Sequence, residues 1–258
     1  SARSSAYGAP AVHLLASMSS EDEYAVVEDE FAERDFAGLK PAKDEDGSPS
    51  EMEAKAMKKY IGILLVAVPV IGQIFAWGSY FALTKLAASQ KVILDKKFAF
   101  IHEHDLGYIY LAVWISAMAR SVLAANANGA RDAARVERPD QHVYKIMANS
   151  GPLKDAPYVL MAGTGPQGRF NRAHRGMFNT DEAMPLYLTY LLLAGAVFGP
   201  VVPCLALLWG IGRAVFGIKY KESTKARGAG LLPSFLAEMW LQGLVLLCAI
   251  KGIFADKF

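Results

Sequence analysis

The sequence predicts an all-α integral membrane protein with five membrane-spanning helices. More than half of its residues (53%) are hydrophobic, and they are concentrated in long runs rather than spread evenly along the chain. Five of these runs approach or exceed the roughly 20 residues that cross a bilayer. The segments between the runs leave no separate soluble domain. A net charge of +2 gives no reason to expect a nucleic-acid partner.

Residues 1–59 form a polar N-terminal extension. Its first twenty residues contain no acid and are rich in serine and alanine, a composition that fits the remnant of an organelle transit peptide or an arbitrary boundary. The remainder is acidic and buries little, so on its own it is expected to be disordered. Its apolar side chains could nevertheless anchor it to a partner; they are Tyr24, Val26, Val27, Phe31 and Phe36.

The apolar runs follow in order. The first covers residues 60–88 and contains Pro69, which predicts a kink that a membrane helix tolerates. Residues 89–105 are predicted to form a loop. The other four runs belong to one domain, residues 106–258, and cover 106–127, 178–198, 201–218 and 233–254.

Positive charges gather in two of the connections, 128–177 and 219–232. These connections lie on the same side of the membrane if the runs alternate in direction, and the positive-inside rule makes that side cytoplasmic, or stromal or matrix in an organelle. The 89–105 segment carries three lysines on the opposite side, so the rule is not obeyed everywhere.

Polar residues recur at helical spacing where two runs approach the basic connections. Arg175, Asn179 and Glu182 share one helix face, and Arg213 and Tyr220 share another. Ionisable groups within spans are expensive and are expected to face a bundle interior or a watered cavity. One interpretation is simple ion pairing at helix ends. Farther from these ends, Arg120 and Glu238 could pair, although ordinary packing is favoured.

The other interpretation is a site for an anionic, peptide-like ligand. An arginine can clamp a carboxylate through two hydrogen bonds. Asparagine and glutamate can hold an amide and an ammonium group. A further arginine beside a thiol lowers the pKa of the thiol and favours the nucleophilic thiolate. Glutathione requires this combination of groups.

Four motifs carry a resemblance to a known family. The pattern Arg-x3-Asn-x2-Glu-x2-Pro runs from Arg175 to Pro185. It is preceded by "ARDAARVERP" and followed by "LAGAVFGP" with "LWGIGRAVFGIKY", and then by "KARGAG". In this order they resemble the MAPEG family, membrane-associated proteins in eicosanoid and glutathione metabolism, and look nearest to its type 3 microsomal glutathione transferases. The resemblance covers about residues 106–254.

The resemblance implies a four-helix bundle that forms a homotrimer, with glutathione in a cleft between neighbouring subunits. Arg227 matches the arginine that activates the thiol, with Lys225 as a competing candidate because the preceding loop is short. The positions that match glutathione-binding residues of the family are Arg131, Arg175, Asn179, Glu182, Arg213 and Tyr220.

Several features depart from the family pattern. Phe216 stands where many catalytic members have a tyrosine, and Ala183 replaces a larger residue. The family has no counterpart of residues 1–105. The segment 139–175 is unusually long, and its histidines, His142 and His174, are expected at the polar surface. His102 and His104 are expected to be solvated, so no metal site is predicted.

Two main hypotheses of function follow. The first is a glutathione transferase or peroxidase that acts on lipophilic electrophiles or lipid hydroperoxides delivered by membrane lipids. The second is a non-catalytic subunit of a large organellar assembly, a photosystem or respiratory complex, with chlorophyll or lipid contacts and neighbouring subunits bound through the N-terminal extension. A regulatory binder of the lipoxygenase-activating type is a third. An organellar membrane, thylakoid or mitochondrial, is favoured over the endoplasmic reticulum.

Overall fold

The computed structural model describes residue 39 and residues 47–86, 88–138, 140–144 and 160–254. The chain divides into two units, residues 1–45 and 46–258, and the second is described below. The predicted transit-peptide remnant and most of the acidic extension lie outside the described residues. The same holds for the middle of the long basic connection.

The described part of the second unit is built from helices, apart from one isolated bridge between Tyr144 and Met161. The prediction of an all-α membrane protein is therefore confirmed. In chain order the elements are α3 (Pro49–Ile61), η2 (Gly62–Ala67), α4 (Val68–Leu86), α5 (Ala88–Glu103), α6 (Gly107–Ala133), α7 (Gly165–Gly195), η3 (Gly199–Val201), α8 (Val202–Glu222) and α9 (Gly228–Ile253).

Four helical stretches within the described residues are long and apolar enough to cross a membrane: Pro49–Lys85, Gly107–Ala133, Gly199–Glu222 and Gly228–Ile253. Five spans were predicted. The remaining one, residues 178–198, falls largely in α7, which is a continuous helix through Pro185. Its long polar first half and the acids Asp181 and Glu182 explain why α7 does not stand out as apolar.

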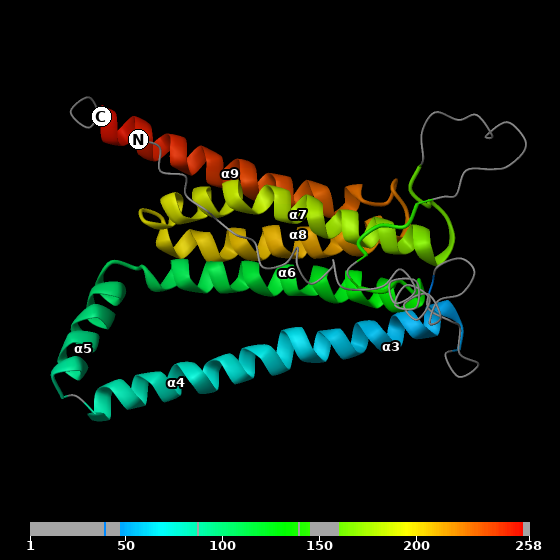
Figure 1. Cartoon of the computed structure of the whole chain (residues 1–258). Helices are drawn as coiled ribbons and strands as arrows, with labels where there is room; N and C mark the ends of the chain where they lie inside the picture. Colours follow the sequence, from blue (N-terminus) through cyan, green and yellow to red (C-terminus); the bar gives the residue numbers. More distant parts are fainter. Residues whose placement is uncertain (1–38, 40–46, 87, 139, 145–159, 255–258) are drawn as a thin grey trace, which may run out of the picture. The chain divides into compact units, whose positions relative to one another are not determined.

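Helices α6, α7, α8 and α9 lie side by side and form a bundle (Figure 1). The centre of the core is Trp209 of α8, whose ring stacks on Tyr187 of α7 with centroids 3.8 Å apart. The hydroxyls of Tyr187 and Ser116 are 3.0 Å apart, which links α6 to α7. Helices α8 and α9 approach so closely that an added Cβ at Gly230 would lie 2.1 Å from the backbone nitrogen of Phe216. Burial of Trp209, Tyr187 and the apolar side chains around them stabilises the bundle.

The N-terminal helix begins eleven residues before the predicted apolar boundary at residue 60. Ser48 accepts a hydrogen bond from the backbone of Glu51, and the Glu51 carboxylate accepts one from the backbone of Ser48. This capping box satisfies two donors at the helix start and nucleates the helix within the polar segment. The helix is buried only there, at Glu53 and Ala56, whereas its apolar stretch is exposed.

The predicted 89–105 loop is wrong, because these residues form helix α5. The segment contains neither glycine nor proline, and Lys91 and Asp95 form an i, i+4 ion pair of 2.7 Å. Helix α5 ends in a turn at residues 104–106, where the φ of Asp105, 56°, lies in the left-handed region.

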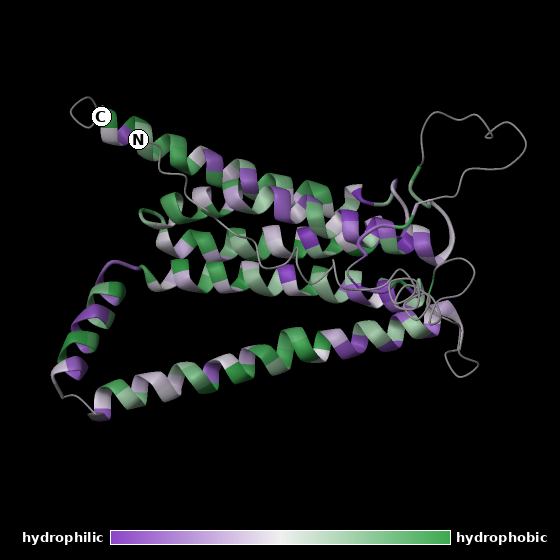
Figure 2. Ribbon diagram, in the orientation of Figure 1, coloured by the Kyte–Doolittle hydropathy of each residue, from purple (hydrophilic) through white to green (hydrophobic). Residues whose placement is uncertain are grey.

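Hydrophilic residues gather at the end of the bundle where α3 and α7 begin, and isolated polar turns interrupt the helices elsewhere (Figure 2). The start of α3, the start of α7 and the end of α8 meet at this end, since Glu53 pairs with both Arg169 and Lys221. The described parts of the two basic connections therefore lie at the same end of the bundle.

Candidate functional site

Two of the predicted site residues line one cavity at the polar end of the bundle. Arg175 comes from the outer face of α7 and Tyr220 from the last turns of α8. The cavity has a volume of about 600 Å³ and is also lined by Asn171, Arg172 and the loop residues 161–165 and 222–224. Arg175 donates to the Glu182 carboxylate over 2.7 Å, as expected for residues on one helix face, and both side chains are well exposed. Within a single chain the charged groups of Arg175 and Glu182 are therefore accessible to a ligand or to a neighbouring molecule.

Arg227, the predicted thiol-activating residue, stands one side chain away from this cavity. Its guanidinium carbon lies 5.5 Å from the centre of the Tyr220 ring, a cation–π distance. Arg227 is the exposed N-cap residue of α9. Lys225, the competing candidate, is also exposed and lies two residues earlier. Tyr220 therefore connects Arg227 with the cavity that Arg175 lines.

Asn179 and Arg213 meet deeper in the bundle. Arg213 is buried and donates through Nη1 to the Asn179 side-chain oxygen over 2.9 Å. Its Nη2 lies 3.6 Å from the Glu238 carboxylate. The guanidinium also covers the Trp209 ring at 5.3 Å. Within the described residues the Nε of Arg213 has no hydrogen-bond partner.

Arg120 and Glu238, which could have paired with each other, each pair with a different residue. Arg120 instead forms a two-point ion pair with Asp181 of α7, with distances of 2.5 and 3.0 Å, while Glu238 pairs with Arg213. Asp181 was missed because the family pattern emphasises its neighbour Glu182. An arginine in one apolar run and an aspartate in another was the signal that could have found the pair.

Arg131, another predicted ligand residue, does not line the cavity. It is buried and donates to the backbone carbonyls of Glu137 and Asp140 over 2.9 and 2.6 Å. The guanidinium carbon of Arg131 lies 5.0 Å from the centre of the Phe170 ring, and Nη2 donates to His174 Nε2 over 3.5 Å. Its donors therefore fasten the chain that leaves α6, and its ligand role stays a prediction.

His174 was expected at the surface, and that expectation is wrong. α7 begins at Gly165, so His174 lies in its third turn and faces the bundle, only 5% exposed, between Phe170 and Phe178. Burial, followed by the nearby charge of Arg131, lowers the pKa of His174 to about 4. The side chain is neutral at physiological pH.

Asn171 holds together the two described ends of the long basic connection. Its amide nitrogen donates to the carbonyls of Val143 and Ala162 over 2.7 and 2.9 Å, and its oxygen accepts from the Val143 N–H over 2.9 Å. Ala162 lines the cavity next to Asn171. Asn171 thus fixes one rim of the cavity, a role that its position in the sequence did not reveal.

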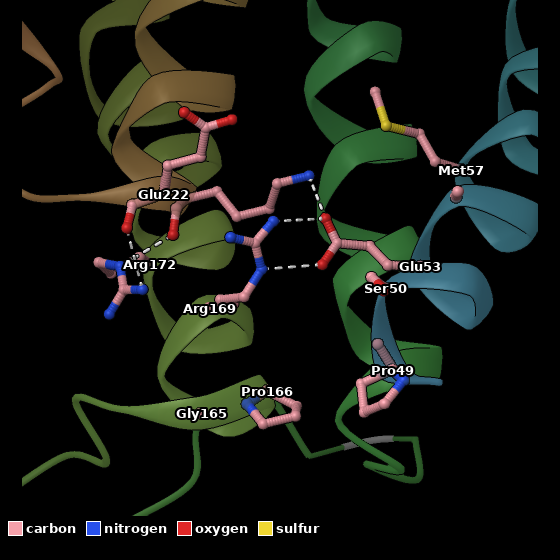
Figure 3. A pocket seen from close by; sticks show the side chains of 12 residues that line it. Pro49, Ser50, Glu53, Met57, Gly165, Pro166, Arg169, Arg172 and Glu222 are labelled. Atoms are coloured by element: carbon pink, nitrogen blue, oxygen red, sulfur yellow. Dashed lines mark hydrogen bonds and ion pairs between the residues drawn. The ribbon is translucent and has the colours of Figure 1, made fainter. Parts of the chain in front are cut away.

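A second cavity, of about 780 Å³, lies where α3 meets the bundle (Figure 3). The Glu53 carboxylate lines it from α3, accepts two hydrogen bonds from Arg169, both 3.0 Å, and forms an ion pair with Lys221 at 2.5 Å. The hydrogen bonds to Glu53 raise the pKa of Arg169. Arg172 and Glu222 line both cavities.

Comparison with known proteins identifies the family of the chain. A model of the MAPEG family matches residues 106–247, which is more than half of the chain and begins where α6 begins. The three elements α3, η2 and α4, together with α5, precede the matched region. A search of curated proteins found no match. The chain belongs to the MAPEG family.

Proposed function

We propose that the chain binds glutathione and conjugates it through its thiol sulfur to lipophilic electrophiles, or uses it to reduce lipid hydroperoxides. One observation carries the proposal: Arg175 and Tyr220 line the same cavity, and the Arg227 guanidinium lies over the Tyr220 ring. The MAPEG family contains glutathione transferases and peroxidases as well as non-catalytic members. A carboxylate-binding arginine inside the cavity and a second arginine one side chain away support the proposal.

The residues divide the work by charge. Arg175 binds a carboxylate of the tripeptide, and Glu182 accepts its ammonium group. Asn179 and Arg213 lie deeper in the bundle, and a ligand role for them and for Arg131 is part of the proposal that rests on the family resemblance. Arg227 stabilises the thiolate, whose proton passes to solvent.

The reaction balances in both versions. In conjugation the thiolate sulfur attacks an electrophilic carbon, a carbon–sulfur bond forms, and the leaving group departs with its electron pair. In peroxide reduction the thiolate attacks the terminal oxygen of the hydroperoxide, the O–O bond breaks and an alcohol leaves. A second glutathione then attacks the sulfur of the resulting sulfenic acid; the S–S bond forms, the S–O bond breaks, and the hydroxyl group leaves as water.

A different observation favours a second candidate function. Phe216 stands at the position where many catalytic members have tyrosine, and it has no hydroxyl to donate a hydrogen bond. Its ring is buried and lies 6.0 Å from the Arg213 guanidinium. Arg131 donates through Nη1 to two backbone carbonyls and through Nη2 to His174, both away from the cavity. This arrangement would suit a non-catalytic accessory subunit of an organellar membrane complex, with chlorophyll or lipid as neighbours and the N-terminal extension as the contact with other subunits.

The decisive experiment uses the full-length protein in lipid nanodiscs. We expect glutathione binding by calorimetry, thiolate absorbance in the ultraviolet, and conjugation of a chlorinated dinitrobenzene. Losing one charge-assisted interaction removes about 1.5–3 kcal/mol, so Arg227→Ala should lower the conjugation rate by roughly 10- to 100-fold and abolish the thiolate signal.

Lys225→Ala is the matched control, because it removes a neighbouring exposed cation. If Lys225→Ala abolishes the thiolate signal and Arg227→Ala does not, the assignment of the activating residue is wrong. Wild-type protein that neither binds glutathione at millimolar concentration nor conjugates the electrophile would overturn the enzyme proposal in favour of the accessory subunit.

A further inference from the structure

The N-terminal helix touches the bundle through a short stripe at its polar start. Glu53 and Ala56 are buried, and Met57 packs so closely on α6 that an added Cβ at Gly129 would lie 3.0 Å from the Met57 Cβ. The apolar stretch that follows is exposed. All of these α3 residues lie outside the region matched by the family model. The contact between α3 and the polar end of the bundle is therefore made by residues outside the matched region.

The Glu53 carboxylate joins two bundle helices. Arg169 comes from the start of α7 and Lys221 from the end of α8, and both point to the same carboxylate (Figure 3). The side chains of Glu53 and Lys221 are 10% and 5% exposed. An ammonium buried to this degree without a counter-charge would be strongly unfavourable. The position of the α8 end consequently depends on Glu53.

One residue, Arg172, connects Lys221 with the candidate glutathione cavity. The Lys221 carbonyl accepts a hydrogen bond from Arg172 Nε over 2.9 Å, and the Gly163 carbonyl accepts one from Arg172 Nη1 over 2.7 Å. Arg172 and Gly163 both line the cavity, and so does Tyr220, the residue directly before Lys221. Displacement of Lys221 would thus move two walls of the cavity together.

We infer that Glu53 is a positioning residue for the candidate glutathione site: it holds the end of α8, and through Lys221 and Arg172 it keeps Tyr220 and the 161–165 rim in place. The inference rests on the proposed function as far as the ligand is concerned. The N-terminal helix is then a working part of the site.

The test compares three full-length variants in nanodiscs. Glu53→Gln keeps the shape of the side chain and removes its charge, and Lys221→Met breaks the same link from the other side while it leaves the Arg169–Glu53 pair intact. Asp95→Asn is the control, because it removes an exposed carboxylate that is also ion-paired, on α5. Amide hydrogen exchange is measured for residues 160–164 and 220–224, with residues 240–250 of α9 as the internal reference.

We expect several-fold faster exchange at the cavity rim in Glu53→Gln and Lys221→Met, with the α9 reference and Asp95→Asn unchanged. We also expect the KM for glutathione to rise about three- to tenfold with little change in kcat, because positioning, not thiol activation, is lost. A merely structural role would raise exchange throughout the bundle instead.

The two possible failures are distinguishable. Unchanged exchange at the rim in both variants overturns the role of Glu53, whatever glutathione does. Wild-type protein that binds no glutathione overturns the proposed function, and the exchange measurement alone then decides whether Glu53 positions the cavity. If Glu53→Gln does not fold, Lys221→Met provides the same comparison.

Discussion

His174 lies where a buried neutral imidazole is required. Arg131 donates to its Nε2, and the charges of Arg131, His142 and Arg120 all oppose its protonation, while Phe170 and Phe178 exclude water. The group precedes the apolar half of α7, so it exchanges protons with the aqueous side. Its low pKa makes the folded protein sensitive to acid.

The stability of the protein should therefore fall as the pH drops from 6.5 towards 4. In this window the unfolded chain protonates His174 and the folded chain does not, whereas above pH 6.5 both forms are neutral and the contribution is complete. One pH unit corresponds to about 1.4 kcal/mol, so a shift from pH 7.5 to 5 costs at most about 2 kcal/mol. The measurement is the thermal unfolding midpoint in nanodiscs at both pH values.

His174→Gln removes the titration but keeps a hydrogen-bond acceptor, so its unfolding midpoint should vary less with pH. His104→Gln, in the exposed turn that follows α5, is the control and should behave as wild type. Equal pH dependence in wild type and His174→Gln would refute the assignment of the acid sensitivity to this residue.

At the residue scale the sequence predicted which polar side chains matter better than it predicted their partners. The ion pair between Arg175 and Glu182 follows from helical spacing, because the two residues lie on one face of α7. The Arg120–Asp181 pair and the clamp by Asn171 depend on how helices rotate against one another and on where a loop returns. Neither is encoded in the spacing along one helix.

Among the elements, the crossing of α8 and α9 is the most sensitive to a change of one methyl group. A Cβ at Gly230 would come within 2.1 Å of the Phe216 nitrogen and 2.3 Å of the Gly212 carbonyl oxygen, and these are backbone atoms that cannot turn away. Overpacking of this kind typically costs about 1–3 kcal/mol. We expect Gly230→Ala to lower the unfolding midpoint by several degrees and to weaken glutathione binding.

The same helix provides matched controls. An added Cβ at Gly243 or Gly252 would meet no atom within 4 Å in the described structure. Alanine has a higher helix propensity than glycine by about 1 kcal/mol, so Gly243→Ala and Gly252→Ala should be neutral or slightly stabilising. If Gly230→Ala matches these controls, the close approach of α8 and α9 is not maintained in the membrane.

Element boundaries were predictable where hydropathy changes and were missed where it does not. The start of α6, the start of α8 and the end of α9 lie within one residue of the predicted boundaries, whereas at the polar end these helices extend four to six residues farther than the apolar runs. α3 and α5 were missed because both are polar enough to read as solvated segments. Helix formation there depends on a capping box and an i, i+4 ion pair, which hydropathy does not report.

For the whole molecule, the Glu53 contacts place the start of α3 at the same end as the 219–232 connection. If the N-terminal helix crosses the membrane, α5 lies on the opposite side. Single cysteines in a variant without Cys204 and Cys248 test this arrangement. We expect a membrane-impermeant maleimide to label Lys55→Cys and Thr224→Cys from one side and Lys96→Cys only from the other. Labelling of all three from one side would show that the helix does not cross.

The outer face of α7 raises the question of what covers it. The side chains of Arg175 and Glu182 are 44% and 58% exposed. Asp181, which pairs with Arg120 of α6, is 37% exposed. Asp181 and Glu182 nevertheless lie in the apolar half of α7. A charged side chain facing lipid at the bilayer centre costs about 2.5–3.5 kcal/mol. The face is therefore better suited to a protein surface or a watered cleft than to hydrocarbon, and a second copy of the chain would supply both.

The resemblance to the MAPEG family implies a homotrimer, and we expect Arg175 and Glu182 to lie at each interface. Native mass spectrometry of protein released from nanodiscs should give three copies, and glutathione should stabilise the trimer against dissociation because the ligand would contact two copies at once. Glu182→Gln leaves Arg175 unpaired at the interface and should weaken the trimer, whereas Asp95→Asn on exposed α5 should not. A single copy that co-purifies with stoichiometric foreign subunits or pigment would contradict the trimer. It would favour the accessory-subunit function, in which another protein covers the charged face of α7.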